Sequence, residues 1–162
     1  MKWSIKSFEQ LSLQELYEIM ALRQEVFVVE QDCPYLDADG KDQDSFHLMA
    51  YEGETLAAYA RMVKPGISYQ EWAIGRVIVK MSYRDKKLGY ELMNRCHEFL
   101  AQKKWSGNSS NLQESSDHFS NCPPVRLSAQ SHLEKFYQNC GYAPTGKEYL
   151  EDGIPHKEML RP

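Results

Sequence analysis

The stretch from Val77 to Asn94 constrains the fold of this chain more than any other part of the sequence. It begins with the β-branched run at residues 77–79, passes through a basic turn to Gly89, and ends in an amphipathic segment. Apolar side chains recur there at helical spacing: Leu88, Leu92, Met93, Cys96, Phe99 and Leu100. We expect a strand over residues 72–79 and a helix over residues 88–103. Because a helix makes the crossover, the next strand of the sheet should run parallel to the first.

The turn between this strand and this helix suits an anion. The first N–H groups of a helix have no acceptor within it, and the helix dipole adds partial positive charge at the same place. Arg84, Lys86 and Lys87 bring three cations to the turn. The sequence therefore predicts a phosphate or pyrophosphate site here. The alternative is that these charges are merely solvated surface groups.

The rest of the chain alternates between strand and helix patterns. Ser12 and Glu15 form a capping box, which predicts a helix over about residues 12–24. Residues 26–30 either extend it or form a second short helical piece, and the Asp-rich residues 32–44 should be a loop. Further patterns predict strands at residues 2–6, 46–51, 55–63, 125–129, 147–151 and 154–160, and a helix at 132–139. Asp152-Gly153 favours a two-residue turn between the last two strands.

This order of elements indicates an α/β (α+β) fold with a mixed, mostly antiparallel sheet of about six to seven strands and helices on both faces. Only the crossover from residues 72–79 to 125–129 must be parallel. At 162 residues the chain can bury a core of its own, so we expect a single domain over residues 1–162. Residues 106–121 are rich in Ser and Asn and poor in aliphatic residues, which predicts a flexible insertion.

Composition argues against several classes of partner. The formal net charge of -4 is unlike that of a nucleic-acid-binding protein. No apolar run is long enough to span a membrane, and the charged N-terminus lacks a signal-peptide core, so we expect no membrane contact and a cytoplasmic location. The cysteines form no C-x-x-C pair, which argues against zinc. We expect buried thiols at Cys96 and Cys140 and leave open a reactive thiol at Cys33 or Cys122.

Asp37, Asp39 and Asp42 surround Gly40 and invite comparison with a calcium loop. The register fails, because Phe46 stands where the bidentate glutamate is needed. We therefore expect no metal.

The basic turn reads Arg84-Asp85-Lys86-Lys87-Leu88-Gly89. Other notable segments are Phe27-Val-Val-Glu-Gln31, Cys33-Pro-Tyr35, Tyr59-Ala-Arg61, Gly75-Arg-Val-Ile-Val79, Ala129-Gln130, His132-Leu133, Phe136-Tyr137 and Asp152-Gly-Ile-Pro-His156. In this order they resemble the GNAT superfamily of N-acetyltransferases, and more closely its small bacterial ElaA-like branch. The superfamily's acetyl-CoA motif has Arg or Gln, two residues, Gly, one residue, then Gly or Ala. This sequence departs from it at Lys87, where ElaA-like sequences also carry lysine.

The resemblance implies a GNAT fold with a cleft where the fourth and fifth strands splay apart. It implies acetyl-CoA as cosubstrate, with the pantetheine amides paired to the backbone of Val77, Ile78 and Val79. The pyrophosphate would meet the turn formed by Arg84, Asp85, Lys86, Lys87, Leu88, Gly89 and Tyr90. Gln130 and Phe136 complete the implied coenzyme site.

Tyr137 is the residue that the resemblance assigns as general acid. When an amine attacks the thioester, a thiolate leaves, and a nearby phenol can protonate it. A tyrosine of ordinary pKa gives up its proton to such a thiolate at a cost of roughly 2 kcal/mol, which acyl transfer can tolerate. The alternative is a core tyrosine on the apolar face of its helix.

The general base is left open among Glu30, His47, Glu71 and His156, or a water relay. The carboxylates near Gly40 either rim the acceptor side and attract an amine, or bond their own backbone as turn formers. Arg76 either faces the cleft or pairs with a carboxylate.

The resemblance therefore implies an N-acetyltransferase that transfers the acetyl group of acetyl-CoA to a primary amine, of a small molecule or a peptide, in a ternary complex. The alternative is a CoA-binding regulatory or interaction module with little catalytic activity. A nucleotide-binding protein is disfavoured, because the sequence has neither a Walker lysine spacing nor a G-x-G-x-x-G motif. Such proteins are often dimers, so a homodimer is possible, and the sequence does not name the acceptor.

Overall fold

A single seven-stranded sheet organises the computed structural model of the chain, which describes residues 1–84, 87–103 and 122–162. The strand order is β1-β2-β3-β4-β5-β7-β6. The strands are β1 (Lys2–Ser7), β2 (Ser45–Glu52), β3 (Thr55–Val63), β4 (Trp72–Val79), β5 (Val125–Gln130), β6 (Ala143–Glu151) and β7 (Ile154–Arg161). All neighbours are antiparallel except β4 and β5, which run parallel as predicted. The sequence-based fold class is thus confirmed.

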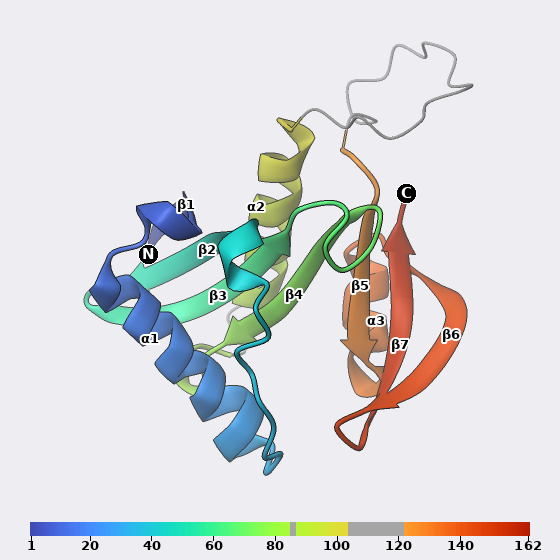
Figure 1. Cartoon of the computed structure of the whole chain (residues 1–162), viewed down its shortest axis with the longest axis horizontal. Helices are drawn as coiled ribbons and strands as arrows, with labels where there is room; N and C mark the ends of the chain where they lie inside the picture. The colour runs from blue at the N-terminus through green and yellow to red at the C-terminus, as the bar shows by residue number, and fades with distance from the viewer. Residues whose placement is uncertain (85–86, 104–121) are drawn as a thin grey trace.

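Helices cover both faces of the sheet. The helix α1 (Leu13–Arg23) lies across β2–β4 on the front face in Figure 1, while α2 (Leu88–Ala101) lies behind the sheet. The short α3 (Glu134–Asn139) packs near β5. The capping box confirms the predicted start of α1: the Glu15 amide donates to the Ser12 hydroxyl at 3.1 Å, and the Ser12 amide donates to the Glu15 carboxylate at 2.9 Å.

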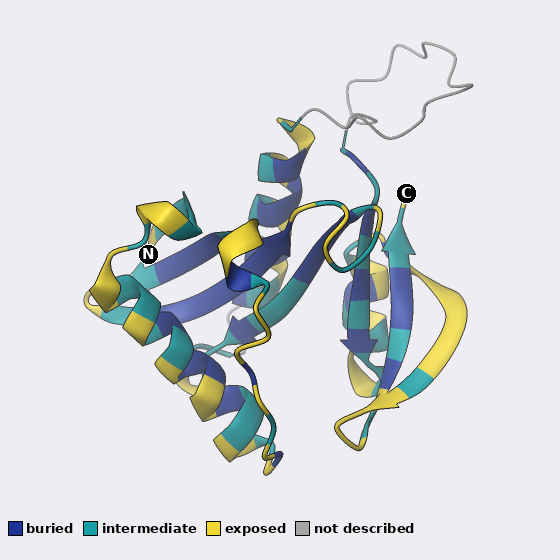
Figure 2. Cartoon of the chain, in the orientation of Figure 1, coloured by how far each residue is buried: buried dark blue, intermediate teal, exposed yellow. Residues whose placement is uncertain are grey.

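Two apolar clusters, one on each face, hold these layers together. Figure 2 shows the buried residues concentrated on the central strands β2–β5. Behind the sheet, Leu92, Met93 and Leu100 of α2 are fully buried against it. In front, Ile19 and Leu22 of α1 pack on Met49, Tyr59 and Ile78. The predicted apolar stripe of α2 is therefore the one that forms the core.

Several boundaries differ from the predicted ones, most of them by one or two residues, and three of the differences are informative. A π-helical segment (Gln24–Glu30) continues α1 without a break, which selects the extension over a separate piece. A 3-10 turn (Ser131–Leu133) precedes α3, so the regular helix begins two residues later than predicted. β6 begins at Ala143 rather than residue 147, with a register shift between Pro144 and Glu148 that the sequence pattern concealed. The predicted insertion at residues 106–121 lies outside the described residues.

Candidate active site

β4 and β5 are paired over a very short distance. Among the described residues their register comprises Trp72 with Val125 and Ala73 with Arg126. Beyond this point β5 pairs with β7 as far as Gln130, while β4 stays paired with β3. The edge of β4 that carries Val77, Ile78 and Val79 therefore has no partner strand on the β5 side in the described part of the chain. A cleft of about 720 Å³ lies between the two diverging strands and is lined by residues of both.

A β-bulge at Arg76 accompanies this divergence. The register between β3 and β4 shifts between Tyr59 and Arg61, and Arg76 has a φ of 52°, which is unusual for a residue with a side chain. The bulge turns the Arg76 guanidinium toward Asp37, whose Oδ1 accepts from Nε at 2.7 Å. Arg76 also lines the cleft, so both alternatives considered for it are realised together.

The N-terminus of α2 opens on the same cleft. A pocket of about 300 Å³ adjoins the main cleft there and is lined by Val79, Arg84, Lys87, Leu88, Gly89, Tyr90 and Phe136. At Gly89 an added Cβ would lie 3.3 Å from Cε2 of Phe136, so only glycine fits without a shift of the ring. Asp85 and Lys86, which were predicted to contribute to this site, lie outside the described residues.

The backbone conformation at Lys87 explains why the family motif has a glycine at this position. It precedes the first residue of α2 with a φ of 55° and a ψ of 14°, in the left-handed region. A non-glycine residue pays roughly 1 kcal/mol for this conformation. The lysine destabilises the fold by this amount, but it places an exposed ammonium group beside the helix N-terminus.

Arg84 is bound to protein groups on two sides. Its Nε donates to the carbonyl oxygen of Val79 at 2.9 Å, and its two terminal nitrogens contact the Glu30 carboxylate at 2.5 and 3.0 Å. The guanidinium therefore ties the turn to the π-helical segment. A phosphate at this turn would meet the backbone amides and Lys87, whereas Arg84 would have to exchange Glu30 for the ligand.

Tyr137 reaches the cleft from α3. It is 7% exposed, lines the cleft, and packs edge-on against Phe136 at 5.0 Å and Tyr142 at 6.1 Å between ring centroids. No other described residue hydrogen-bonds its hydroxyl. Burial raises the pKa of the phenol above its ordinary value, so it is protonated across the physiological range. A buried, unpartnered phenol is therefore available to a ligand in the cleft.

Three arginines and three aspartates form an ion-pair network beside the cleft, in which Arg23, Arg61, Asp37 and Asp42 are buried and Arg76 and Asp39 are partly exposed. Arg23 donates to Asp37 and to Asp42 at 2.6 Å each. Arg61 contacts both Asp39 oxygens at 2.7 Å and Asp42 at 2.9 Å. These carboxylates are therefore mainly ion-pair partners. Asp39 also lines the cleft and accepts from the Lys41 amide at 3.1 Å, so both expected roles are present at this one residue beside its ion pairs.

The four candidate bases differ in what they already bind. Glu71 accepts from Nε and Nη2 of Arg126, at 3.1 and 2.7 Å, and these hydrogen bonds lower its pKa. Glu30 is paired with Arg84. His47 is fully buried, burial lowers its pKa, and its two nitrogens lie 2.8 Å from the Tyr59 hydroxyl and 3.0 Å from the Asp42 carbonyl. His156 lines the cleft.

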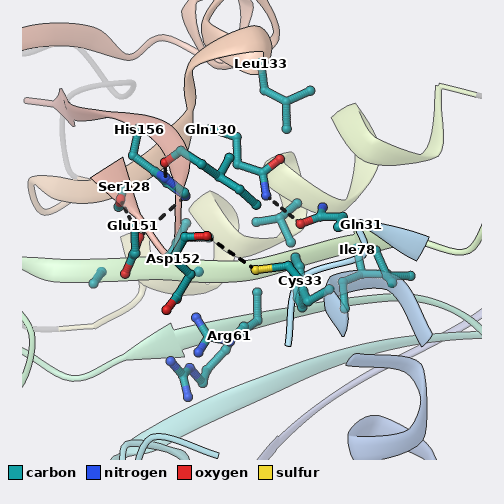
Figure 3. A pocket seen from close by; sticks show the side chains of 18 of the residues that line it. Gln31, Cys33, Arg61, Ile78, Ser128, Gln130, Leu133, Glu151, Asp152 and His156 are labelled. Carbon is teal, nitrogen blue, oxygen red and sulfur yellow. Dashed lines mark hydrogen bonds and ion pairs between the residues drawn. The ribbon is translucent and has the colours of Figure 1, made fainter. Parts of the chain in front are cut away.

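The sequence analysis named His156 but missed the polar side chains that surround it on the β5–β7–β6 wall. The Tyr149 hydroxyl donates to Ser128 at 2.5 Å, and the Ser128 hydroxyl lies 3.3 Å from the Glu151 carboxylate. Figure 3 shows Ser128, Glu151 and His156 together on one side of the pocket. The signal was present in the predicted Asp152-Gly153 turn, since a two-residue turn fixes Tyr149 opposite His156.

Two contacts connect the walls of the cleft. The Gln130 side-chain amide donates to the Gln31 side-chain oxygen at 3.0 Å, and the Cys33 thiol lies 3.6 Å from the Asp152 carbonyl oxygen. Both contacts appear as dashed lines in Figure 3. Gln130, expected in the coenzyme site, thus lies at the cleft with its amide directed across it. Cys33, left open as a reactive thiol, is buried under this contact.

Other kinds of site are not found in the described part of the chain. No group of three or more His, Cys, Asp or Glu side chains there could hold a metal ion. Within the same residues, no helix has the length and apolar character needed to cross a bilayer.

Known structures share this architecture over its full length. An acyl-CoA N-acyltransferase from Pseudomonas aeruginosa is 37% identical, matches with a TM-score of 0.83, and covers 100% of both chains. The crystal structure of Escherichia coli ElaA is 37% identical, with a TM-score of 0.82 and 99% of each chain covered. The splayed sheet and its cleft define an acyltransferase of the class that uses acyl-CoA thioesters.

The sequence comparisons identify the family. The acetyltransferase (GNAT) domain profile matches residues 8–161. Protein ElaA of Escherichia coli is 39% identical over 162 residues, which cover 99% of this chain and 95% of that protein. The chain belongs to the GNAT acetyltransferase family, in its ElaA-like branch.

Proposed function

We propose that this protein transfers an acetyl group from acetyl-CoA to a primary amine, by direct attack within a ternary complex. The observation that carries the proposal is that three separate features line one continuous depression. These are the unpaired edge of β4, the N-terminus of α2 and the Tyr137 phenol.

The edge of β4 suits the pantetheine arm. Pantetheine has two amides, and an unpaired strand edge presents alternating N–H and C=O groups that match them. In the proposed complex the amides pair with Val77, Ile78 and Val79, on the side that β5 leaves open. The arm then takes the place of a neighbouring strand.

The N-terminus of α2 suits the diphosphate. The amides of Leu88 and Gly89 begin the helix, whereas the Tyr90 amide already donates to the Lys87 carbonyl at 3.1 Å. The glycine lets the chain approach the ligand closely where Phe136 packs behind it. Lys87 adds a cation that no carboxylate of the described residues pairs with. Both features favour a ligand with two negative phosphates.

Tyr137 is proposed as the general acid. Burial raises its pKa, which on its own makes proton release harder. The same desolvation also raises the pKa of a thiol in this cleft. The gap between the pKa of the phenol and that of the thiol is therefore smaller than the shift of Tyr137 alone suggests. The phenol, free of other partners, can donate to the leaving sulfur as the C–S bond breaks.

The test combines binding with turnover. Calorimetric titration with coenzyme A should show binding, and release of free thiol from acetyl-CoA should be followed with tyramine, putrescine and a lysine peptide. Tyr137→Phe should lower kcat by about 10²-fold while the affinity for coenzyme A and the melting temperature stay near those of the wild type. Tight coenzyme binding with no thiol release on any amine would instead favour the CoA-binding module. A Tyr137→Phe enzyme with unchanged kcat would remove the acid role.

A further inference from the structure

His156 is held in one orientation at the cleft wall. The residue is 8% exposed, and its Nδ1 lies 2.7 Å from the carbonyl oxygen of Ile154. A carbonyl oxygen can only accept, so Nδ1 carries a hydrogen in this contact. In the neutral imidazole the lone pair is then on Nε2. The Tyr149 ring stacks on the imidazole with an interplanar angle of 13°, which keeps the ring in this plane.

Nε2 faces a carboxylate. Its distance to Oε2 of Glu151 is 3.4 Å, longer than an ordinary hydrogen bond. A lone pair beside a carboxylate is an unfavourable contact, whereas an N–H at the same place would be attracted to it. The Glu151 carboxylate therefore lies where it would attract a hydrogen on Nε2. The same Glu151 oxygen lies 3.3 Å from the Ser128 hydroxyl, which gives the carboxylate a second contact.

The other candidate bases are less suited to this role. Glu30 and Glu71 each accept two hydrogen bonds from one arginine guanidinium. His47 has both ring nitrogens occupied and is not among the residues lining the cleft. His132 lines the cleft, but no described carboxylate pairs with it. His156 thus combines a position at the cleft with a fixed tautomer and an acidic neighbour.

We propose that His156 is the general base that takes a proton from the acceptor's ammonium group, and that Glu151 positions the resulting imidazolium. This inference rests on the proposed acetyltransferase function. It assigns the acceptor to the β5–β7–β6 wall of the cleft, next to Ser128, Glu151 and His156. The acceptor class it implies is an amine that enters the cleft as a cation.

The protons balance over one turnover. The ammonium group gives one proton to Nε2 of His156, and the neutral amine forms a C–N bond with the thioester carbonyl. The C–S bond then breaks, the sulfur takes the Tyr137 proton, and the nitrogen releases its second proton, which restores the phenol. The proton on His156 leaves through Glu151, whose side chain is 54% exposed. The products are an amide, free coenzyme A and one proton in solvent.

Several charged and titratable groups surround His156. Glu151 and Tyr149 face it from β6, and Tyr149 is in turn bonded to Ser128 of β5. Glu158, further along β7, is engaged by Arg126 at 2.6 Å. Glu151 is therefore the charged neighbour in direct contact with the imidazole.

The test is the pH dependence of kcat/KM with whichever of the three amines turns over fastest. The wild type should lose activity on the acidic side as His156 takes up a proton. His156→Gln should lower kcat/KM at pH 7 by about 10²-fold and should lose that acidic limb. Its activity should recover toward high pH, where the free amine itself is deprotonated. Glu151→Gln should lower kcat/KM at pH 7 about 10-fold, because the imidazolium loses the carboxylate that positions it.

His132→Gln serves as the matched control, since it removes a second histidine of the cleft and should leave the shape of the pH profile unchanged. A His156→Gln enzyme that keeps the acidic limb and lies within threefold of the wild type would overturn the proposal. Coenzyme affinity of His156→Gln, measured by calorimetry, should stay within about threefold of the wild type, which separates loss of the base from loss of the fold. Nitrogen NMR of the wild type gives a check without turnover: a hydrogen on Nε2 instead of Nδ1 in the neutral ring would also overturn it. If the wild type itself acetylates no amine, the proposed function fails, and this inference fails with it.

Discussion

The two walls of the cleft hold their charges in different ways. On the α1–β3–β4 wall, Arg23 is fully buried, Asp37 is 4% exposed, and the two side chains form an ion pair at 2.6 Å. On the β5–β7–β6 wall, Glu151 is more than half exposed and approaches His156 no closer than 3.4 Å. The comparison teaches that full pairing and burial fix a charge in one state, whereas loose pairing at a surface leaves a group free to change its protonation. We expect substitutions in the first wall to alter stability and those in the second to alter turnover.

The largest effect should come from Arg23. Arg23→Leu leaves Asp37 and Asp42 buried without one of their cations, which should lower the free energy of unfolding by about 3–5 kcal/mol. Urea denaturation measures it. The control is Lys80→Leu, which breaks the exposed pair with Glu25 and should cost under about 1 kcal/mol. Equal losses for the two variants would break the comparison between the walls.

The second-largest effect should come from lowering the pH, which protonates carboxylates of the α1–β3–β4 wall. Burial alone would raise the pKa values of Asp39 and Asp42, but Arg61 and Arg23 respectively hold them below the ordinary value. The native state therefore binds fewer protons than the unfolded chain, and the stabilisation is complete above the unfolded pKa of about 3.9 and is lost as the pH falls below it.

Asp39 is partly exposed, so solvent screens its ion pair and the stabilisation should be about 1 kcal/mol. Urea midpoints of the wild type and of Asp39→Asn should be compared at pH 7, 5 and 3. The variant should be less stable at pH 7 and should lose less stability between pH 5 and pH 3. Parallel pH curves would mean that Asp39 does not carry this charge in the native state.

The smallest effect should come from Lys87, which directly precedes α2. Lys87→Gly relieves the left-handed conformation, although glycine also gains entropy in the unfolded chain. The net result should be a gain of about 0.5 kcal/mol in unfolding free energy. Lys87→Ala removes the same charge and keeps the Cβ, so it should show no gain. Both variants should bind coenzyme A more weakly than the wild type, and a gain in stability for alanine as large as that for glycine would exclude the backbone explanation.

Local patterns were sufficient to predict most of the fold. The apolar stripe of α2, the Ser12 capping box and the Asp152-Gly153 turn each depend on neighbours in sequence, and each appears in the structure. The parallel pairing of β4 and β5 followed from the crossover alone. The π-helical segment and the early start of β6 were not resolved, because Val26 to Val29 and Pro144 to Lys147 fit no regular period.

The site could be predicted less completely. The bulge at Arg76 is invisible in the sequence, since Gly75 to Val79 reads as an ordinary strand. The pairing of Arg84 with Glu30 joins residues 54 positions apart, and that of Arg126 with Glu71 joins residues 55 apart. The packing of the helices and strands determines which residues pair over such separations, and the spacing of residues in the sequence does not indicate it.

The short junction between β4 and β5 has a mechanical consequence. Two backbone register pairs, reinforced by the bond from Arg126 to Glu71, join the halves of the sheet. A thioester lying along β4 and touching Tyr137 would bridge these halves beyond the two register pairs. The loaded molecule would then be stiffer than the empty one, and amide protons of Val77–Val79 would exchange with solvent most slowly when the cosubstrate is bound.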